Sequence, residues 1–428
     1  MNGEHFIPFR KTDVVTMCSD ELPADERGSF RGFTRMLESL LHHRFRDRIE
    51  ALKDAYHPFN PEADTRTLGE LSAADRAAAQ QRLEDELTAL AHAANYSPMD
   101  VGELQRAAGV HSLLKVRMEI NTDVIDKIIF FRRGESTRTR EVPIWYGLRR
   151  RTVSFTNYAR VLVYAKFKDA EHFEGADLDR LPFRPGSTIV KLFQNVPRDD
   201  LEMVFPNVQV RMRLVDKLLI GVPALISGVF VIVTKLFATL GLLLVLLGFW
   251  LGLSERDVTL NQAALVSAGA GLFAFGGFLV RQVTKFKNRK ILFMKALSEN
   301  LYFRNLDNDA GVFHNLLDAA EEMEVIEAVL AYHFVRTAPT PPTSSELDGL
   351  VEGWFARRWD ARLDFEVEDG LRKVRELGLV TEDGAGRLHA VTLTGAKERM
   401  DRVWDDVFDY ANPAGAPRFS TPGPRLAG

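Results

Sequence analysis

The sequence predicts an α+β protein in which an integral membrane helical hairpin separates an N-terminal α+β soluble domain from a C-terminal winged-helix-like soluble domain. Three observations lead to this prediction. Long apolar runs lie close together at residues 218–280, short strand-like segments precede them, and helix and strand signals in winged-helix order follow them. At 428 residues the chain is long enough for two or three domains.

Composition narrows the class of protein. The net charge of −4 argues against a general nucleic-acid coat. The single cysteine, Cys18, excludes an internal disulfide, and no Cys/His spacing suits structural zinc. The N-terminus carries Glu4 and Asp13 and lacks the apolar core of a secretory signal. We therefore expect cytoplasmic soluble parts, in a cell that the Ala/Arg-rich, Lys-poor usage suggests is bacterial.

Residues 1–110 are predicted to be helical. Apolar residues recur at steps of three and four over residues 30–55, which predicts one helix with a single buried face. A second helix is predicted at residues 73–94, with Ser72 as its N-cap. A third helix is expected to begin at Ser97, which a proline follows.

Residues 111–210 are predicted to form a small antiparallel β-rich region. Its strands are predicted from segments rich in β-branched and aromatic residues, at 124–131, 151–158, 160–167 and 187–193. Residues 132–138 are expected to form a hairpin turn, and a short helix is expected to begin at Pro197. Arg149, Arg150 and Arg151 are interpreted as a strand edge or solvated loop, with an anion site as the alternative.

The apolar runs are predicted to form a membrane hairpin. A helix of about 18 residues rises roughly 27 Å, close to the thickness of a bilayer's hydrocarbon core. We predict two spans, at about residues 236–253 and 263–280, with residues 218–234 as an interfacial or kinked lead-in. Three crossings are the alternative.

Basic residues flank both ends of the apolar block. This predicts an even number of crossings with both termini in the cytoplasm, and hence a multi-pass protein of the bacterial inner membrane. These basic residues are predicted to fix the topology and to meet anionic headgroups: Arg211, Arg213, Lys217, Arg281, Lys285, Lys287, Arg289 and Lys290.

Small residues recur along both predicted spans. They are expected to let the two helices pack closely: Gly241, Gly248, Gly252, Ser267, Ala270, Ala274 and Gly277. Neither span has an ionisable residue in its interior. This speaks against a pump or a proton-coupled transporter.

Residues 281–335 are predicted to be helical, and Asp309 is expected to cap the helix that follows it. On that helix His314, Asp318 and Glu321 share one face at a spacing that metal ligands use. A run of glutamates is usually a solvated face, and the helix already has a good apolar stripe. We therefore assign no metal to this face.

Residues 336–412, with the helix at 312–335, are predicted to form a winged-helix-like domain. Two helices, a two-stranded wing at 379–394 and a last helix give that order. The helix in the DNA-reading position has four acidic and three basic residues, whereas a DNA reader needs a positive surface. We predict protein contact for this domain instead, and a disordered tail at 413–428.

Three stretches carry a resemblance to a known family: FIPFRKTDVV (6–15), KLFQNVPRDDLEMVFP (191–206) and the segment 285–334. They resemble the transmembrane protein 143 family, which has bacterial members and a mitochondrial one in animals. Its shared domain has no known function. The resemblance covers about residues 4–335 and implies two membrane spans. It brings no activity, cofactor or catalytic residue.

No motif of an enzyme is present: there is no HExxH, no GxSxG, no nucleotide-binding loop and no nucleophile with an evident base. We expect no enzyme activity, no cofactor and no catalytic or metal-binding residue. The prediction is a non-enzymatic integral membrane scaffold or regulator that binds a protein partner or lipid headgroups, and no nucleic acid. Homo-oligomerisation is left open. The alternatives are an oligomeric channel or transporter built from the hairpin, an enzyme using the helix around His314, and membrane-tethered gene regulation.

Overall fold

The computed structural model describes residues 5–65, 71–100, 117–120, 123–144, 149–175, 177–206, 208–211 and 301–407, with individual residues between 247 and 299. The chain divides into two compact units, which are described separately. The first joins three stretches, Met1–Ala108, Thr122–Val204 and Arg304–Gly428. The second joins Gly109–Asn121 and Phe205–Phe303.

The N-terminal helices of the first unit are α1 (Lys11–Asp20), α2 (Ala24–Tyr56) and α3 (Ala73–Ala93). They confirm the helices predicted at residues 30–55 and 73–94. The Ser72 hydroxyl accepts a hydrogen bond from the backbone N–H of Asp75, which confirms the predicted N-cap.

The helix predicted to begin at Ser97 is wrong, because that residue begins strand β1 (Ser97–Met99). Asn95, in the left-handed region with φ of 57°, ends α3 and redirects the chain. A proline at a sheet edge loses no ladder hydrogen bond, so Pro98 is tolerated in β1.

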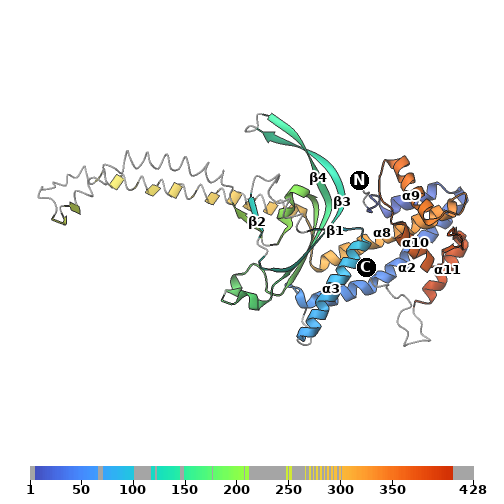
Figure 1. Cartoon of the computed structure of the whole chain (residues 1–428), viewed down its shortest axis with the longest axis horizontal. Coiled ribbons are helices and arrows are strands. Elements are labelled where there is room, and N and C mark those ends of the chain that lie inside the picture. The colour runs from blue at the N-terminus through green and yellow to red at the C-terminus, as the bar shows by residue number, and fades with distance from the viewer. Residues whose placement is uncertain are drawn as a thin grey trace. The chain divides into compact units, whose positions relative to one another are not determined.

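The first unit contains an antiparallel sheet in the order β1-β3-β4-β5-β7 (Figure 1). Its other strands are β3 (Ile125–Ile144), β4 (Arg149–Phe167), β5 (Thr188–Pro197) and β7 (Asn305–Asn308). The β character predicted for this region is confirmed, but the predicted strands at 151–158 and 160–167 are one strand. The connections between these elements contain four 3₁₀-helices: η1 (His57–Phe59), η3 (Ala170–Phe173), η4 (Leu178–Arg180) and η5 (Arg198–Val204). The last of these, η5, lies where a short helix was predicted.

The hairpin turn predicted at residues 132–138 is wrong, since these residues run through the middle of β3. Gly134 adopts φ of 75° and lies so close to β4 that an added Cβ would be 2.6 Å from Ala159 Cβ. The register is the same on both sides of the glycine, with Arg133 opposite Arg160 and Glu135 opposite Tyr158, so Gly134 does not reverse the chain. β3 and β4 continue past it and pair as far as Ile144 and Arg149.

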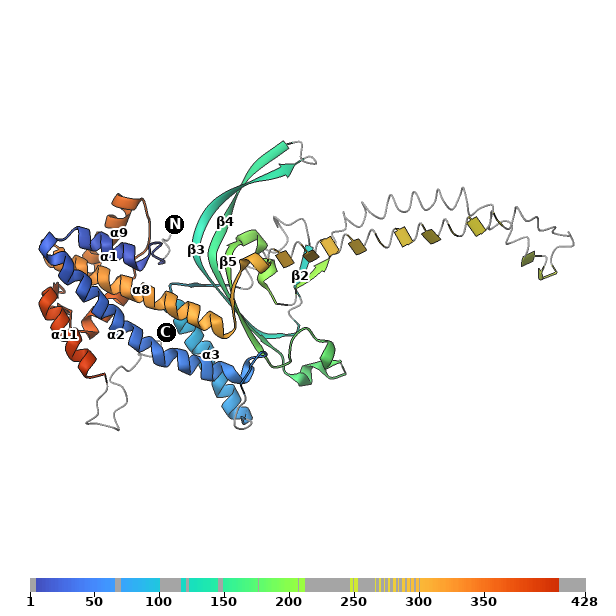
Figure 2. The same cartoon turned by 180° about the vertical axis from the view of Figure 1, so that it is seen from behind.

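Helix α8 (Ala310–Thr337) lies alongside α2 and belongs to two hydrophobic clusters (Figure 2). Its first half, including Phe313 and Leu316, packs with α2, α3 and the sheet residues Leu162 and Tyr164. Its second half is buried almost all round, from Met323 onward, in a cluster shared with α1, α2 and the C-terminal elements. α8 thus connects the sheet to the C-terminal region.

The C-terminal elements are α9 (Ser344–Trp359), α10 (Val367–Glu376), β8 (Val380–Glu382), β9 (Leu388–Ala390) and α11 (Leu393–Asp405). Their order after α8 is the order predicted for a winged-helix-like domain. A capping box begins α9, in which Thr343 and Glu346 each accept a hydrogen bond from the other's backbone N–H.

In the second unit β2 (Arg117–Ile120) pairs antiparallel with β6 (Val208–Arg211). The described residues between 247 and 299 are helical apart from Leu251 and Gly252, which lie in a turn.

The prediction of an integral membrane hairpin is corrected by the structure. None of the described helices is both long and apolar enough to cross a membrane. The predicted spans at 236–253 and 263–280, and the lead-in at 218–234, lie largely outside the described residues. Hydropathy of a run measures its preference for an apolar solvent, whereas a span also requires one continuous helix of sufficient length. The integral membrane function, the channel or transporter alternative and the multi-pass inner-membrane localisation rested on that hairpin and are not supported.

Candidate functional site

The residues predicted to meet headgroups or to pack between spans belong to the second unit. Arg211 ends β6, and Arg281 and Lys287 are exposed helical residues. Gly248 is half-buried, Ala270 and Gly277 are exposed, and Gly252 lies in a turn with φ of 70°. The remainder lie outside the described residues: Arg213, Lys217, Lys285, Arg289, Lys290, Gly241, Ser267 and Ala274. Their predicted roles stay predictions.

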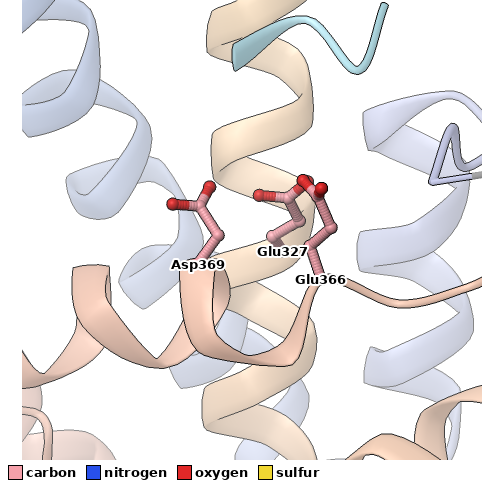
Figure 3. Close-up of side chains that lie close together, drawn as sticks. All are labelled: Glu327, Glu366 and Asp369. Carbon is pink, nitrogen blue, oxygen red and sulfur yellow. The ribbon is translucent and has the colours of Figure 1, made fainter. Parts of the chain in front are cut away.

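The acidic face of α8 does not form a cluster of ligands. His314 and Asp318 are exposed, while the Glu321 carboxylate lies 2.8 Å from Nδ1 of His42 on α2. Where side chains are described, one group of three has its potential ligand atoms within 4.8 Å of one another, Glu327, Glu366 and Asp369 (Figure 3).

This group lies at the contact between α8 and α10. Glu327 comes from the buried half of α8, Glu366 precedes α10, and Asp369 is in its first turn. The two helices approach closely at Gly370, where an added Cβ would be 3.0 Å from the Glu327 carbonyl oxygen. A glycine at this position therefore allows the carboxylates to come together.

A buried ammonium group neutralises the cluster. Lys373, one turn after Asp369, has no exposed side-chain surface. Its Nζ donates to Glu327 Oε2 at 2.6 Å and lies 2.7 Å from Asp369 Oδ2. Arg372 Nη2 donates to Asp369 Oδ1 at 2.5 Å, so this carboxylate has two cationic partners.

Two further segments of the chain complete the cluster. The Asn95 side-chain amide, at the end of α3, donates to Glu327 Oε1 at 3.1 Å and to the carbonyl oxygen of His5 at 3.0 Å. Nδ1 of His5 lies 3.7 Å from Glu366 Oε1. The cluster therefore joins the N-terminal segment, α3, α8 and α10.

The environment shifts the pKa values of the cluster in opposite directions. Burial, reinforced by the negative charge of Asp369, raises the pKa of Glu327 to about 7, although Lys373 opposes this. Burial opposes ionisation of Asp369 too, but Lys373 and Arg372 hold its pKa well below its usual range. Burial alone would lower the pKa of Lys373, and the carboxylates of Glu327, Glu324 and Asp369 overcome this and raise it.

These groups leave little place for a metal ion. Three carboxylates would suit a hard cation such as Ca²⁺ or Mg²⁺. The Lys373 ammonium already contacts two of them and keeps its proton, so a second cation would meet like charge at short range. A protonated lysine is also no nucleophile. The arrangement is that of an ion cluster that fixes α10 against α8.

Lys373 was not predicted to be buried, because it lies among six other charged residues in and just before α10. A signal was present in the spacing: Lys373 lies three residues after Gly370 and four before Leu377, both of which are buried. Glu327 likewise interrupts an apolar run in α8. Two opposite charges at apolar positions of two neighbouring helices indicate a buried pair.

A second candidate is the two-stranded ribbon that we call the arm, residues 136–144 of β3 and 149–157 of β4. β5 accompanies β4 only as far as Asn157, which pairs with Pro197. β1 accompanies β3 only as far as Arg132. The two long strands therefore continue beyond the rest of the sheet (Figures 1 and 2). At about 3.4 Å per residue, the paired length of the arm is roughly 30 Å.

The arm is basic. It contains five arginines and one acidic residue: Arg138, Arg140, Arg149, Arg150, Arg151 and Glu141. Directly opposite residues of an antiparallel pair share a face. The register pairs Arg138 with Phe155 and, two residues on, Arg140 with Val153. One face of the arm therefore alternates arginine and apolar positions, and Arg149 to Arg151 lie in strand β4, as the strand-edge interpretation predicted.

Comparison with known proteins adds a family of unknown function. Residues 158–311 match the family described as "Protein of unknown function (DUF3754)". The match begins directly after the arm, in β4, and ends at the start of α8. Nothing in it links the chain to the transmembrane protein 143 family. No solved structure matches the chain.

Proposed function

We propose that this chain is a non-enzymatic interaction protein in which the arm contacts a protein partner. The observation that carries the proposal is the length of the arm. Its two strands pair with each other beyond the last residues that pair with β1 and β5. A two-stranded hairpin is only marginally stable in water. A partner that covers a face or an edge of the arm would stabilise it.

Exposure of the arm supports this role. Ser136, Thr137, Arg138 and Thr139 of β3 are exposed, as are Thr152 and Ser154 of β4. Arg138 at the base donates to Asn195 Oδ1 at 3.1 Å and so fastens the arm to β5. A ribbon that is anchored at its base and exposed at these positions is suited to contact another molecule.

The absence of enzyme activity is part of the proposal and is supported by the state of the buried reactive groups. Lys373 keeps its proton in the ion cluster, and burial raises the pKa of the Cys18 thiol, so that neither is an activated nucleophile.

We also propose protein contact, without nucleic acid, for the winged-helix-like elements. The basic residues of α10 face acidic partners: Arg372 pairs with Asp369 and Glu376, and Arg375 with Glu368 and Glu382. Phosphates would have to displace these carboxylates.

The finer family assignment, to relatives of transmembrane protein 143, rests on the three sequence stretches described above. One of them, residues 191–206, lies within the matched region, and another, 285–334, overlaps its end. The proposed function does not depend on it, because that family supplies no activity.

Shortening the arm tests the proposal. A variant in which Asn-Gly replaces residues 139–154 retains Arg138 and its contact with Asn195, and it should keep the thermal unfolding midpoint of the full chain, because no other strand pairs with the removed residues within the described structure. In its source cells the full chain should crosslink to protein partners that the variant loses, as measured by quantitative mass spectrometry. An unchanged set of crosslinked proteins would contradict the proposal.

A further inference from the structure

We propose that the partner segment recognised by the arm is an extended acidic peptide that adds as a strand to the edge of β4 next to Pro197. This inference rests on the proposed function and names the chemistry of its partner. Addition of a strand to an exposed edge is a common mode of peptide recognition, in which main-chain hydrogen bonds supply affinity and alternate side chains supply specificity.

The edge is created where β5 ends. β5 runs beside β4 from Thr188, opposite Lys166, to Pro197, opposite Asn157. Proline has no N–H and cannot extend the ladder, and the chain continues into η5, which remains in contact with β4 but forms no strand ladder with it. From Thr156 to Arg149, none of the described strands lies on this side of β4. An incoming strand would continue the line of β5.

The charge of this edge selects the partner. Residues 149–156 contain Arg149, Arg150 and Arg151 and no acidic residue. In a paired strand, directly opposite residues have Cβ atoms roughly 5 Å apart, so acidic residues of the peptide would meet the arginines. Guanidinium groups bind carboxylates through paired, charge-assisted hydrogen bonds.

The alternation of β4 adds a second requirement. Residues two apart share a face of a strand, so Val153 and Phe155 share a face with Arg151. The other face continues from Arg150 through Thr152 and Ser154. A matching peptide therefore has acidic residues at one end and alternates apolar with polar residues at the other.

Arginines on an edge also have a protective role, because charges discourage strands from pairing by accident. The two roles predict opposite effects of removing the charges. If the arginines protect the edge, their loss promotes self-association. If they recognise a peptide, their loss weakens its binding.

Binding of a synthetic peptide to the full chain, followed by fluorescence anisotropy, tests the proposal. The probe has a run of glutamates followed by alternating valine and threonine, and it is made in both chain directions. One direction should bind. Two further peptides carry N-methyl groups on alternate backbone nitrogens, one on the odd-numbered residues and one on the even-numbered residues. Only one of these two sets of amides would pair with β4. Methylation of that set should therefore weaken binding about tenfold or more, and methylation of the other set should not.

Variants locate the site. The double substitution Arg149→Glu and Arg151→Glu should weaken peptide binding by at least about tenfold, whereas lysine at both positions should retain most of it. Arg402→Glu, at an exposed arginine of α11, is a control outside the arm and should bind as the unmodified chain does.

Several outcomes would overturn the inference. One is equal binding of all methylated peptides, which would mean attraction by charge alone. Others are binding of anionic lipid vesicles or RNA but not of the peptide, and self-association of the glutamate variant with no peptide binding by the unmodified chain. Failure of this inference is distinguishable from failure of the proposed function. If the peptide does not bind but the arm-shortened variant loses its cellular partners, the arm is a contact surface whose partner is not an acidic strand.

Discussion

At the scale of single residues, the pairing of Lys373 with Glu327 holds the C-terminal elements in place. The two residues lie 46 positions apart in the sequence, and both are buried. Removing one charge from such a pair leaves the other buried without compensation, which is far less favourable than removing both. The cluster is therefore expected to respond differently to single and double substitutions.

We predict that Lys373→Met lowers the free energy of unfolding by about 3–5 kcal/mol, because Glu327 and Asp369 lose their shared cation. The double variant Lys373→Met with Glu327→Met should recover part of this loss, since Asp369 keeps Arg372. Urea denaturation of the three proteins measures both effects. A double variant less stable than Lys373→Met would show that the buried pair is not the source of the loss.

The raised pKa of Glu327 predicts a pH dependence of stability. Its ordinary value is 4.5 and its value in the folded chain is about 7. Between these values the folded chain holds a proton that the unfolded chain has released, so stability falls as the pH rises through this window. The expected loss is on the order of 2–3 kcal/mol, at 1.36 kcal/mol per pKa unit.

Glu327→Gln isolates this effect because glutamine does not titrate. Urea midpoints measured from pH 4.5 to 7 should decline more steeply for the unmodified chain than for the variant. Parallel curves would mean that Glu327 does not take up a proton on folding.

At the scale of elements, the base of the arm depends on Gly134. Its φ of 75° disfavours any residue with a side chain, and a Cβ would clash with Ala159. Gly175 provides a matched comparison, because its φ is 85° but an added Cβ would meet no atom within 4 Å.

Gly175→Ala should therefore measure the backbone effect alone, about 1–2 kcal/mol. Gly134→Ala should be less stable by a further ~1–3 kcal/mol, because the extra methyl must be accommodated between two strands. Thermal or urea denaturation of the two variants gives the difference. Equal losses would indicate that β4 moves away from the methyl without strain.

Local patterns predicted many of these elements. Apolar periodicity identified α2, and the Ser72 cap indicated where α3 begins. The turn predicted at 132–138 failed because Gly134 was taken as a reversal, although Thr137 and Thr139 alternate with arginines as they do in a strand.

Partners distant in sequence could not be predicted. Asp309 is an example: it precedes α8 as expected, but its carboxylate makes no capping hydrogen bond. It accepts hydrogen bonds from the Tyr56 hydroxyl at 2.7 Å and from the Val190 backbone at 3.3 Å. Local sequence contains no information about such contacts. The same holds for the ion cluster and for the edge beside Pro197, which depends on where β5 stops.

At the scale of the whole molecule, the apolar runs at residues 218–280 led to the wrong prediction. The prediction of a membrane hairpin organised every functional hypothesis, and the described structure does not support it. The α+β class survives because it rests on separate signals, the periodicity of the N-terminal helices and the strand composition of residues 111–210.

The place of α8 in two hydrophobic clusters has a consequence for synthesis of the chain. α2 leaves the ribosome long before α8, its neighbour in both clusters. At roughly 5–20 residues per second, the stretch from Tyr56 to Ala310 takes on the order of ten to fifty seconds to translate. During that time side chains such as Phe30, Phe33 and Leu37 lack the residues of α8 that they pack against in the folded chain. The nascent N-terminal half therefore exposes apolar side chains that only α8 and the C-terminal elements can cover.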